Sequence, residues 1–362
     1  MQRRFLFVAL FIMAVFVGNC KSAVSEIISP KTISPSVDTD SLQLKVLQLN
    51  VWQEGTMLNG GFDAIADVII QSKADVVTLS EVRNYNGTKF NERIISALKV
   101  KGANFYSFYD NNVSILSKFQ IASFTAGMYS GNFDKIILQP SKEVRIAVYS
   151  VHIDYTHYAC YLPRGYDGVT WKKLPAPITD VNAILQQNID SKRDEAINAF
   201  VADAAEEQKK GSIIIMGGDF NEPSHLDWTE ATKNLFDHNG TVVPWHNSIT
   251  LQNKGYKDAY RVKYPDPVKY PGFTWAAFNA NAELSKLVWA PDADERDRID
   301  FIYYNDDKRI TLQNIIVVGP SACIVRGSGF EDRTLSDPLL KPNGIWPSDH
   351  KGLLATFKIT KK

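Results

Sequence analysis

The sequence predicts an α+β fold in which two β-sheets pack face to face and carry helices on their outer faces. Segments typical of strands outnumber helical segments along the 362 residues. Helical segments stand between some of the strands, whereas the short strands between 104 and 153 follow one another without a helix, which favours antiparallel pairing. The chain is 44% hydrophobic, enough for a sizeable core, and shows no internal repeat at a fixed period.

The first half of this fold is expected between residues 42 and 153. Apolar and polar residues alternate in LQLKVLQLNVW (42–52), which predicts a strand. Ile65, Ile69 and Ile70 have helical spacing and predict a helix over 61–73. The next segments are expected to be a buried strand at 74–82, a helix at 91–100, and short strands at 104–109, 113–117, 135–139 and 144–153.

The second half begins with a long connection, residues 154–179. A loop of this length is usually functional or disordered, and its five aromatic residues, Tyr155, Tyr158, Tyr161, Tyr166 and Trp171, argue against disorder. A helix follows, with one face marked by Ile197, Phe200, Val201 and Ala204. Strands are then expected at 213–219, 298–304, 312–318 and 351–359.

The N-terminal residues are expected to lie outside this core. Residues 1–19 combine a basic start with an apolar run of 14 residues, the layout of a secretory signal peptide. Small residues followed by Cys20 are similar to a bacterial lipoprotein signal, in which this cysteine is lipidated; an ordinary secreted chain is the alternative. Residues 20–41 are then a flexible tether, and 42–362 form the folded domain. The expected location is the periplasm or the cell surface, with attachment to the membrane through lipidated Cys20.

The charge balance argues against a general nucleic-acid binder. The chain has 40 basic and 40 acidic residues; removing residues 1–19 takes away two arginines and leaves 38 − 40 = −2. Proteins that bind nucleic acid without specificity rely on many cationic contacts with phosphates, so we expect a small phosphorylated substrate rather than duplex nucleic acid. CxxC, HExxH, GxSxG and GxxxxGK[ST] are absent, which removes the usual support for zinc peptidases, serine hydrolases and P-loop proteins.

Polar and ionisable residues stand at the ends of the expected buried strands. They are Asn50, Glu81, His152, Asp219, Asn221, Asp300, Asp349 and His350. Each could be an ordinary turn, surface or hydrogen-bonded residue when taken alone. Together they indicate a site, because buried polar groups are costly unless they are paired or bound to a metal, and this set suits a hard cation and a phosphate.

The order of these motifs resembles the endonuclease/exonuclease/phosphatase superfamily, also called DNase I-like. The resemblance covers residues 43–360 and lies in LN, SE, VH, GGDFN, RID and SDH, of which GDFN together with the C-terminal SDH is specific. It implies a four-layer α/β/β/α sandwich of two mostly antiparallel sheets flanked by helices. It also implies a hydrolase of phosphoester bonds, either a phosphodiesterase or a phosphomonoesterase, that depends on Mg²⁺, with Mn²⁺ as the alternative metal.

The resemblance also implies a role for each site residue. Glu81 would be the main metal ligand with Asn50 beside it, and Asp349 would complete this metal site or form a second one. Asp219 would orient or deprotonate the attacking water, Asn221 would hold the phosphate, and His350, oriented by Asp300, would contact the phosphoryl group. Which group is the base stays open, and His152 matches the histidine of the nuclease and sphingomyelinase branches.

General chemistry asks for the same residue types. Mg²⁺ prefers oxygen ligands, and a carboxylate paired with a histidine fixes the tautomer of the imidazole. Two glycines, Gly217 and Gly218, end the strand before Asp219, and we expect them to let the backbone pass close to a bound phosphate.

The motifs do not specify the substrate. Arg164, His225 and Trp228, together with the aromatic connection, are candidates for a pocket that stacks a sugar or a base and holds an anion; a packed Ω-loop without ligand contacts is the alternative. Other functions left open are a sphingomyelinase-like phosphodiesterase for lipid headgroups, a secreted nuclease, and a non-catalytic lipoprotein that binds a phosphorylated ligand.

Cys160 and Cys323 could form a disulfide bond. If His152 and His350 face one phosphate, the connections that carry these cysteines meet at the same rim of the sandwich. Outside the cytoplasm a bond is then expected if the Cα atoms come within about 7 Å, with two unrelated buried thiols as the alternative.

Overall fold

The computed structural model describes residues 27–28, 41–108 and 112–361. The expected signal peptide and Cys20 lie outside the described residues. Within the expected tether, Ile27–Ile28 (β1) pairs antiparallel with Ser107–Phe108 (β4). None of the helices in the described ranges has the length and hydrophobicity needed to cross a bilayer.

Two six-stranded sheets dominate the described part of the chain. Sheet I runs in the order β10 (Tyr256–Asp258), β11 (Asp300–Asn305), β9 (Ile213–Asp219), β8 (Val144–His152), β7 (Phe133–Ser141) and β6 (Ile121–Gly127). Sheet II runs in the order β15 (Leu339–Leu340), β12 (Ile310–Val318), β16 (Gly352–Thr360), β2 (Ser41–Asn50), β3 (Val76–Ser80) and β5 (Val113–Ser117). A small hairpin joins β13 (Cys323–Val325) and β14 (Ser328–Phe330).

The helices are mostly short and lie outside the sheets. The α-helices are α1 (Gly61–Ser72), α2 (Phe90–Val100), α3 (Met128–Gly131), α4 (Val181–Ile189), α5 (Arg193–Lys209), α6 (His246–Asn253) and α7 (Ala259–Lys263). Single turns of 3₁₀ helix occur at η1 (Gln53–Gly55), η2 (Asn84–Asn86), η3 (Ala159–Tyr161) and η4 (Leu284–Lys286).

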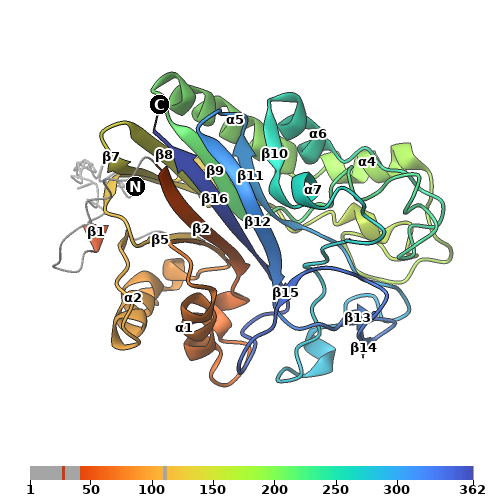
Figure 1. Cartoon of the computed structure of the whole chain (residues 1–362). Helices are drawn as coiled ribbons and strands as arrows, with labels where there is room; N and C mark the ends of the chain where they lie inside the picture. Colours follow the sequence, from red (N-terminus) through yellow and green to blue (C-terminus); the bar gives the residue numbers. More distant parts are fainter. Residues whose placement is uncertain (1–26, 29–40, 109–111, 362) are drawn as a thin grey trace, which may run out of the picture.

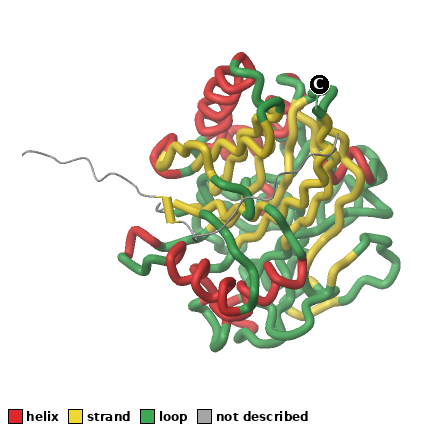
Figure 2. The backbone as a smooth tube through the Cα atoms, turned by 60° about the vertical axis from the view of Figure 1, so that its left-hand side comes forward, coloured by secondary structure: helices red, strands yellow, loops and turns green. Residues whose placement is uncertain are grey.

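The layers follow from where the apolar side chains pack. Residues such as Val46 of sheet II and Val148 of sheet I share one buried cluster between the sheets. On the outer face of sheet II, α1 and α2 bury residues such as Ile65 and Ile94; on the outer face of sheet I, α5 and α6 bury residues such as Phe200 and Leu251. Figures 1 and 2 show the sheets between these helices. The predicted four-layer α/β/β/α sandwich is confirmed.

Most strand pairs in these sheets are antiparallel, as predicted, but β2 pairs parallel with β3, β8 with β9, and β12 with β15. The first two exceptions have helices in their connections, α1 between β2 and β3, and α4 and α5 between β8 and β9. A parallel pair needs such a crossover to bring the chain back to the same end of the sheet. Both crossovers place the C-terminal ends of their paired strands at one edge, where the polar residues stand.

Parts of the element prediction differ from the structure. The strand expected at 104–109 is shorter in the described residues, where β4 covers Ser107–Phe108, and β6 is among the elements that were not predicted. Only the first residue of β6, Ile121, is buried, so its sequence lacks the apolar pattern that marks a buried strand.

A fourth apolar cluster lies under the long connections. The connection 154–179 contributes Tyr158, Tyr161 and Tyr166, which pack with Trp245 and Ile324. The connection is therefore a packed loop built around its own aromatic residues.

Candidate active site

The ends of both sheets converge on one group of polar side chains. In sheet II, Asn50 ends β2, Glu81 directly follows β3, and Asp349 and His350 precede β16. In sheet I, the strand register places His152 beside Asp219, and Asp219 beside Asp300. The fold thus brings together side chains separated by up to about 300 residues in the sequence.

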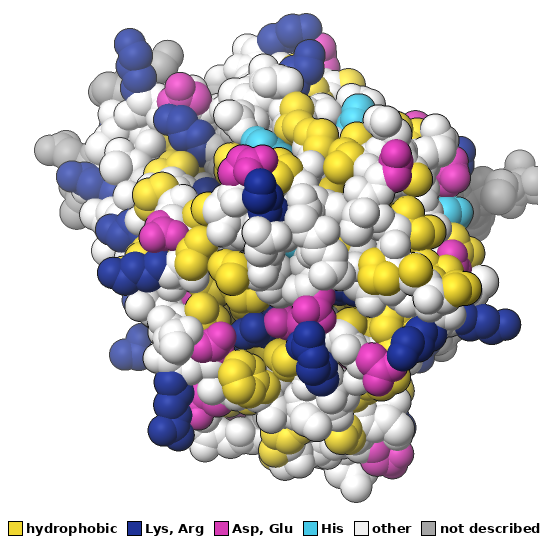
Figure 3. All heavy atoms as spheres, turned by 90° about the vertical axis from the view of Figure 1, so that its right-hand side faces the viewer, with side chains coloured by type: hydrophobic (Ala, Val, Ile, Leu, Met, Phe, Trp, Pro, Cys, Tyr) yellow, Lys and Arg dark blue, Asp and Glu magenta, His cyan; other side chains and the backbone are white. Residues whose placement is uncertain are grey.

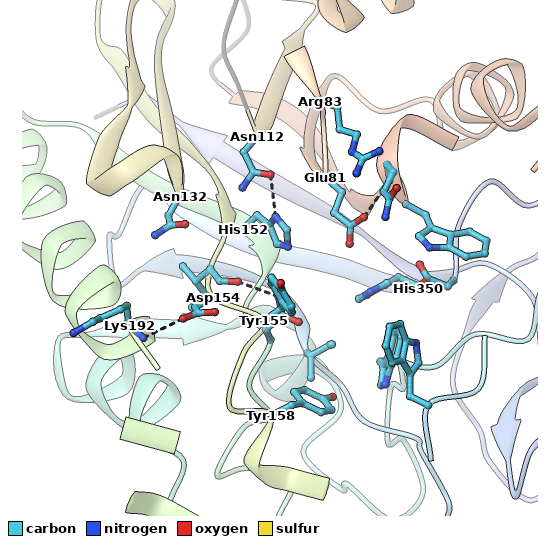
Figure 4. A pocket seen from close by; sticks show the side chains of 18 of the residues that line it. Glu81, Arg83, Asn112, Asn132, His152, Asp154, Tyr155, Tyr158, Lys192 and His350 are labelled. Atoms are coloured by element: carbon cyan, nitrogen blue, oxygen red, sulfur yellow. Dashed lines mark hydrogen bonds between the residues drawn. The ribbon is translucent and has the colours of Figure 1, made fainter. Parts of the chain in front are cut away.

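Glu81, His152 and His350 line an open pocket with a volume of about 970 Å³, and Asn50, Asp219 and Asp300 lie directly behind them. Figure 4 shows Glu81, His152 and His350 pointing into the pocket from different segments of the chain. Asp349 and Asn221 also line the pocket, and aromatic residues form much of the remaining wall. A phosphate group fills only part of this volume, so there is room for the group that carries it.

Asn50 links the two sheets at the centre of the site. Its Nδ2 donates to Glu81 Oε1 at 3.0 Å and to Asp219 Oδ2 at 2.9 Å. Its Oδ1 accepts the backbone N–H of Trp52 at 2.9 Å. In this orientation Asn50 presents its amide nitrogen to the carboxylates, and a role as a metal ligand requires its oxygen instead.

Glu81 is held by its backbone as well as by its partners. It has φ 62°, in the left-handed region that residues other than glycine rarely adopt. Its Oε2 accepts the backbone N–H of Gln53 at 3.0 Å. Such a conformation is maintained only when the surroundings enforce it, and it turns this carboxylate into the pocket.

His350 is fixed by a buried chain of hydrogen bonds. Its Nδ1 lies 2.9 Å from Asp300 Oδ2, and Asp300 Oδ1 accepts from Gln48 Nε2 at 2.7 Å. Its Nε2 lies 3.8 Å from Asp219 Oδ2. The carboxylate at Nδ1 therefore leaves Nε2 facing the pocket floor.

His152 and Asn221 flank Asp219 on the other side. His152 Nε2 lies 4.0 Å from Asp219 Oδ2, and its Nδ1 lies 3.3 Å from Asn112 Oδ1. Asn221 donates its backbone N–H to Asp219 Oδ1 at 2.9 Å, and its Nδ2 donates to the carbonyl oxygen of Ile153 at 3.0 Å. Asn221 thus anchors Asp219 and the end of β8 while it lines the pocket.

The site perturbs the acidity of its own members. Burial raises the pKa of Asp219 to about 6, and neighbouring Asp300 adds to this rise. Burial raises the pKa of Asp349 to about 8; His350 opposes the rise and Glu81 adds to it. Burial disfavours the charge on His350, but the Asp300 and Asp219 carboxylates outweigh it and raise the pKa to about 10. His350 therefore carries a positive charge at neutral pH. The carboxyl groups around it outnumber this one positive charge, so they raise one another's pKa values.

A divalent cation fits this arrangement. Ligand atoms of Glu81, Asp219 and His350 all lie within 4.8 Å of one another, and because His350 is protonated at neutral pH, the two carboxylates are the members that would bind the ion. Asp349 Oδ1 is buried and has no hydrogen-bond partner among the described residues. A cation would satisfy this oxygen and remove the repulsion that raises the carboxylate pKa values. Glu81 belongs both to this group and to the predicted ligand set, whereas predicted Asn50 and Asp349 lie beside it.

Comparisons with known proteins identify the family. The sequence profile of the Endonuclease/Exonuclease/phosphatase family matches residues 47–350, most of the chain. The chain belongs to this family. An uncharacterized protein of Caenorhabditis elegans is 29% identical over 263 residues, 72% of this chain and 78% of that protein.

The chain is also similar to solved structures at low identity. A humanized TDP2 of D. rerio has 14% identity and a TM-score of 0.48, over 87% of this chain and 98% of that one. The human Nocturnin catalytic domain, solved with a bound sulfate anion, has 14% identity and a TM-score of 0.48, over 93% of this chain and 98% of that one.

Some residues expected near the phosphoesterase site lie elsewhere. Arg164 is buried in an ion pair with Asp297, so it cannot hold a ligand anion. Trp228 is buried and stacks on His238, and His225 bonds Ser248 and Gln252. The prediction that they line a substrate pocket was wrong, because each of them contacts a partner within the packed connections instead.

Of the two alternatives for Cys160 and Cys323, the structure has two buried free thiols rather than a disulfide bond. The expected contact of the two glycines with a phosphate was wrong. Gly217 and Gly218 are absent from the pocket lining. A Cβ on Gly217 would lie 2.5 Å from Thr78 Oγ1 of the other sheet, and one on Gly218 would collide with the carbonyl oxygen of Val151. The glycines allow close packing of strands and sheets rather than a phosphate contact.

Several pocket residues were missed. Gln48 stands two positions before Asn50, so strand periodicity puts both on one face, and this spacing could have indicated its contact with Asp300. Trp275 packs its ring against His350 with centroids 4.8 Å apart, and Asn112, Lys192 and Trp289 also line the pocket. Gln48 lies on β2 behind the pocket lining, whereas the other four residues come from connections between strands, whose course no local pattern predicts.

Proposed function

We propose that this protein is a Mg²⁺- or Mn²⁺-dependent hydrolase of phosphoric esters that acts outside the cytoplasm on a small phosphorylated substrate. One observation carries the proposal. Glu81, Asp349 and His350 line one pocket, Asp219 lies within 4.8 Å of Glu81 and His350, and one buried carboxylate oxygen of Asp349 lacks a partner among the described residues. Membership in the Endonuclease/Exonuclease/phosphatase family supports it.

The metal would be held by Glu81 with Asp219 or Asp349 beside it. When bound, it would polarise the phosphoryl group and offset the charge that develops on its oxygens. Without the metal, the ionised Asp219 carboxylate would repel the phosphoryl oxygens, so hydrolysis should require the cation.

The protein's own side chains supply the proton chemistry. Asp219 has a pKa of about 6, so it is ionised at neutral pH and can accept a proton from a water molecule. His350 is protonated at that pH and can donate from Nε2 to a phosphoryl oxygen, while Asp300 holds its other nitrogen. His152 stands on the far side of Asp219 and is placed to contact the same phosphate.

The surface charges support a small substrate. Basic and acidic side chains are interspersed over the face in Figure 3, with hydrophobic atoms between them. This distribution agrees with the equal numbers of basic and acidic residues and offers no continuous track for a polynucleotide backbone on that face.

A substrate screen tests the proposal. The purified protein is assayed with Mg²⁺, with Mn²⁺ and with EDTA against mononucleotides, dinucleotides, sugar phosphates, inositol phosphates, phospholipids and plasmid DNA. We expect phosphate release or diester cleavage of a small ester that stops in EDTA. Binding without turnover of any ester would favour a non-catalytic phosphoryl-binding protein, and activity mainly on plasmid DNA or phospholipid would replace the proposed substrate class.

A further inference from the structure

An aromatic wall leads from the reactive end of the pocket to its mouth. It consists of Trp275, Tyr158, Trp171 and Trp289, all of which line the pocket. Trp275 contacts His350, Trp171 contacts Tyr158 with centroids 5.9 Å apart, and Trp171 contacts Trp289 at 5.3 Å. Flat apolar faces therefore begin beside the reacting groups and continue outward.

Tyr161 braces this wall from behind. It packs edge-on against Tyr158 and Trp171, and its hydroxyl lies 3.4 Å from Trp275 Nε1. The same hydroxyl donates to buried Glu295 at 2.7 Å. Glu295 in turn accepts the backbone N–H of Trp289, at 3.1 Å to one oxygen and 3.2 Å to the other. One residue thus joins three members of the wall.

Trp171 is held in an unusual conformation. It has φ 61°, which a bulky residue adopts only under constraint. Asp167 fixes the turn by accepting the backbone N–H of Thr170 at 2.6 Å, and Lys173 forms an ion pair with Asp292 at 2.6 Å across to the segment of Trp289. Strain at such a position is expected at ligand sites, where the surroundings fix a side chain in one place.

The outer end of the wall is open to solvent. Trp289 is 44% exposed although its backbone is fixed by Glu295. Its ring contacts Trp171 within the pocket lining, so part of an apolar aromatic face is available to a ligand in the pocket. The pocket volume of about 970 Å³ exceeds what a phosphate group occupies.

The charged groups around this wall are paired within the protein. Lys173 pairs with Asp292 at 2.6 Å, and Lys192 of the pocket lining pairs with Glu195 at 3.8 Å. A group on the wall would therefore be held by stacking on the ring faces rather than by an ion pair, which favours an uncharged ring over a quaternary ammonium group.

We infer that the aromatic wall recognises an uncharged, flat-faced ring carried by the phosphate ester, either a nucleobase or a pyranose. Both rings present a face that stacks on an indole. The inference deepens the proposed function, because it assigns the substrate class of the same pocket. Trp289 is a specificity residue in this assignment and takes no part in the bond cleavage.

Ligand binding in EDTA tests the assignment without turnover. Saturation-transfer NMR titrations use adenosine 5′-monophosphate, glucose 6-phosphate, glycerol 3-phosphate and phosphocholine as probes. We expect adenosine 5′-monophosphate or glucose 6-phosphate to bind more tightly than both ringless esters. Whichever of these two ring-bearing esters binds more tightly identifies the ring. Trp289→Ala should lower the ratio of affinities for that ester and glycerol 3-phosphate by about fivefold or more, and Trp289→Phe by less.

Phe330→Ala is the matched control, because Phe330 is 45% exposed and lies outside the pocket lining. It should leave the ratio unchanged, and thermal unfolding establishes that each variant is folded. If Trp289→Ala is folded, an unchanged ratio of affinities in that variant overturns the assignment. If Trp289→Ala is not folded, an unchanged ratio in folded Trp289→Phe overturns it. Phosphocholine bound as tightly as the ring-bearing esters also overturns it.

The two proposals can fail separately. If the protein binds the ring-bearing ester through Trp289 but has no esterase activity, the proposed function is contradicted. The role of the aromatic wall in ring recognition would still stand. Metal-dependent hydrolysis with equal efficiency on esters with and without a ring would contradict the assignment of the aromatic wall to ring recognition. The proposed function would still stand.

Discussion

The carboxyl group of Asp349 determines how the metal-free protein responds to pH. Its pKa is about 8 in the folded chain, against an ordinary value of 3.8. A group that binds its proton more tightly in the folded state stabilises that state at low pH, and this contribution is lost as the pH rises from about 4 to 8. Ionisation of Asp349 therefore makes the metal-free protein less stable at high pH, where the ionised carboxylate binds a cation best.

Asp349→Asn should separate stability from metal binding. Without a carboxylate to ionise, the free energy of unfolding at pH 9 in EDTA should increase by at least about 1 kcal/mol, close to the value of one pKa unit. The increase should disappear at pH 4, and Mg²⁺ should stabilise the variant less than the wild type. Denaturant titrations at both pH values measure this. A variant less stable than the wild type at pH 9 would mean that the ionised carboxylate has partners that stabilise it.

Mg²⁺ should compete with protons at the same carboxylates. Because Asp219 and Asp349 have pKa values of about 6 and about 8, the affinity for Mg²⁺ should rise between pH 6 and pH 9, with proton release on binding. Calorimetric titrations in two buffers of different ionisation enthalpy detect the released protons. An affinity independent of pH would place the ion away from these groups.

At the level of single residues, strand ends could be predicted better than chemical details. A polar residue at either end of an apolar strand indicates Asn50, Glu81, Asp219 and Asp300 without any structure. The orientation of the Asn50 amide and the inter-sheet bond from Gln48 depend on how the two sheets face each other, which no local pattern contains. The individual catalytic and metal-binding roles of these residues stay predictions.

Among the elements, β9 shows how tightly the sheets pack at the site. Its last residues are Gly217, Gly218 and Asp219, and the glycines leave room for Thr78 of β3 and Val151 of β8. The sequence predicted the strand, but the glycines had been assigned to a phosphate contact. A local sequence cannot show which neighbour a glycine approaches.

Gly218→Ala should therefore damage the fold rather than phosphate binding alone. The added methyl group collides with the backbone of Val151, which cannot move as a flexible side chain would, so we expect a loss of about 1–3 kcal/mol or more in unfolding free energy. Gly344→Ala is the control, since a Cβ there meets nothing within 4 Å. Equal stability of the two variants would contradict the packing role.

For the whole molecule, the layered architecture could be predicted and the connections could not. Apolar periodicity marks strands such as β2 and helices such as α1, and two half-buried sheets with outer helices follow from burying those faces. The connection 154–179 follows no period, and its buried Arg164 and free Cys160 satisfy partners from distant segments. Predicting those partners requires the tertiary structure.

Membrane attachment through Cys20 stays a prediction, because this residue lies outside the described part of the chain. Cys20→Ser should move the protein from the membrane to the soluble fraction and leave the hydrolysis rate unchanged, since the cysteine precedes the folded domain. Fractionation of cells that express either form measures it. A wild-type protein found in the soluble fraction would rule out the lipid anchor.

The central claim is that Asp219 and its neighbours form a metal-dependent phosphoesterase site, and one measurement tests it most directly. Hydrolysis of the best substrate is compared for the wild type, Asp219→Asn and Glu81→Gln in Mg²⁺ and in EDTA, with Glu230→Gln as an exposed control in an ion pair with Lys233. The account predicts activity that vanishes in EDTA and falls by at least about 10²-fold in both site variants, with folding retained and the control unaffected. Full activity in EDTA, or more than about a tenth of it in Asp219→Asn, would contradict the account.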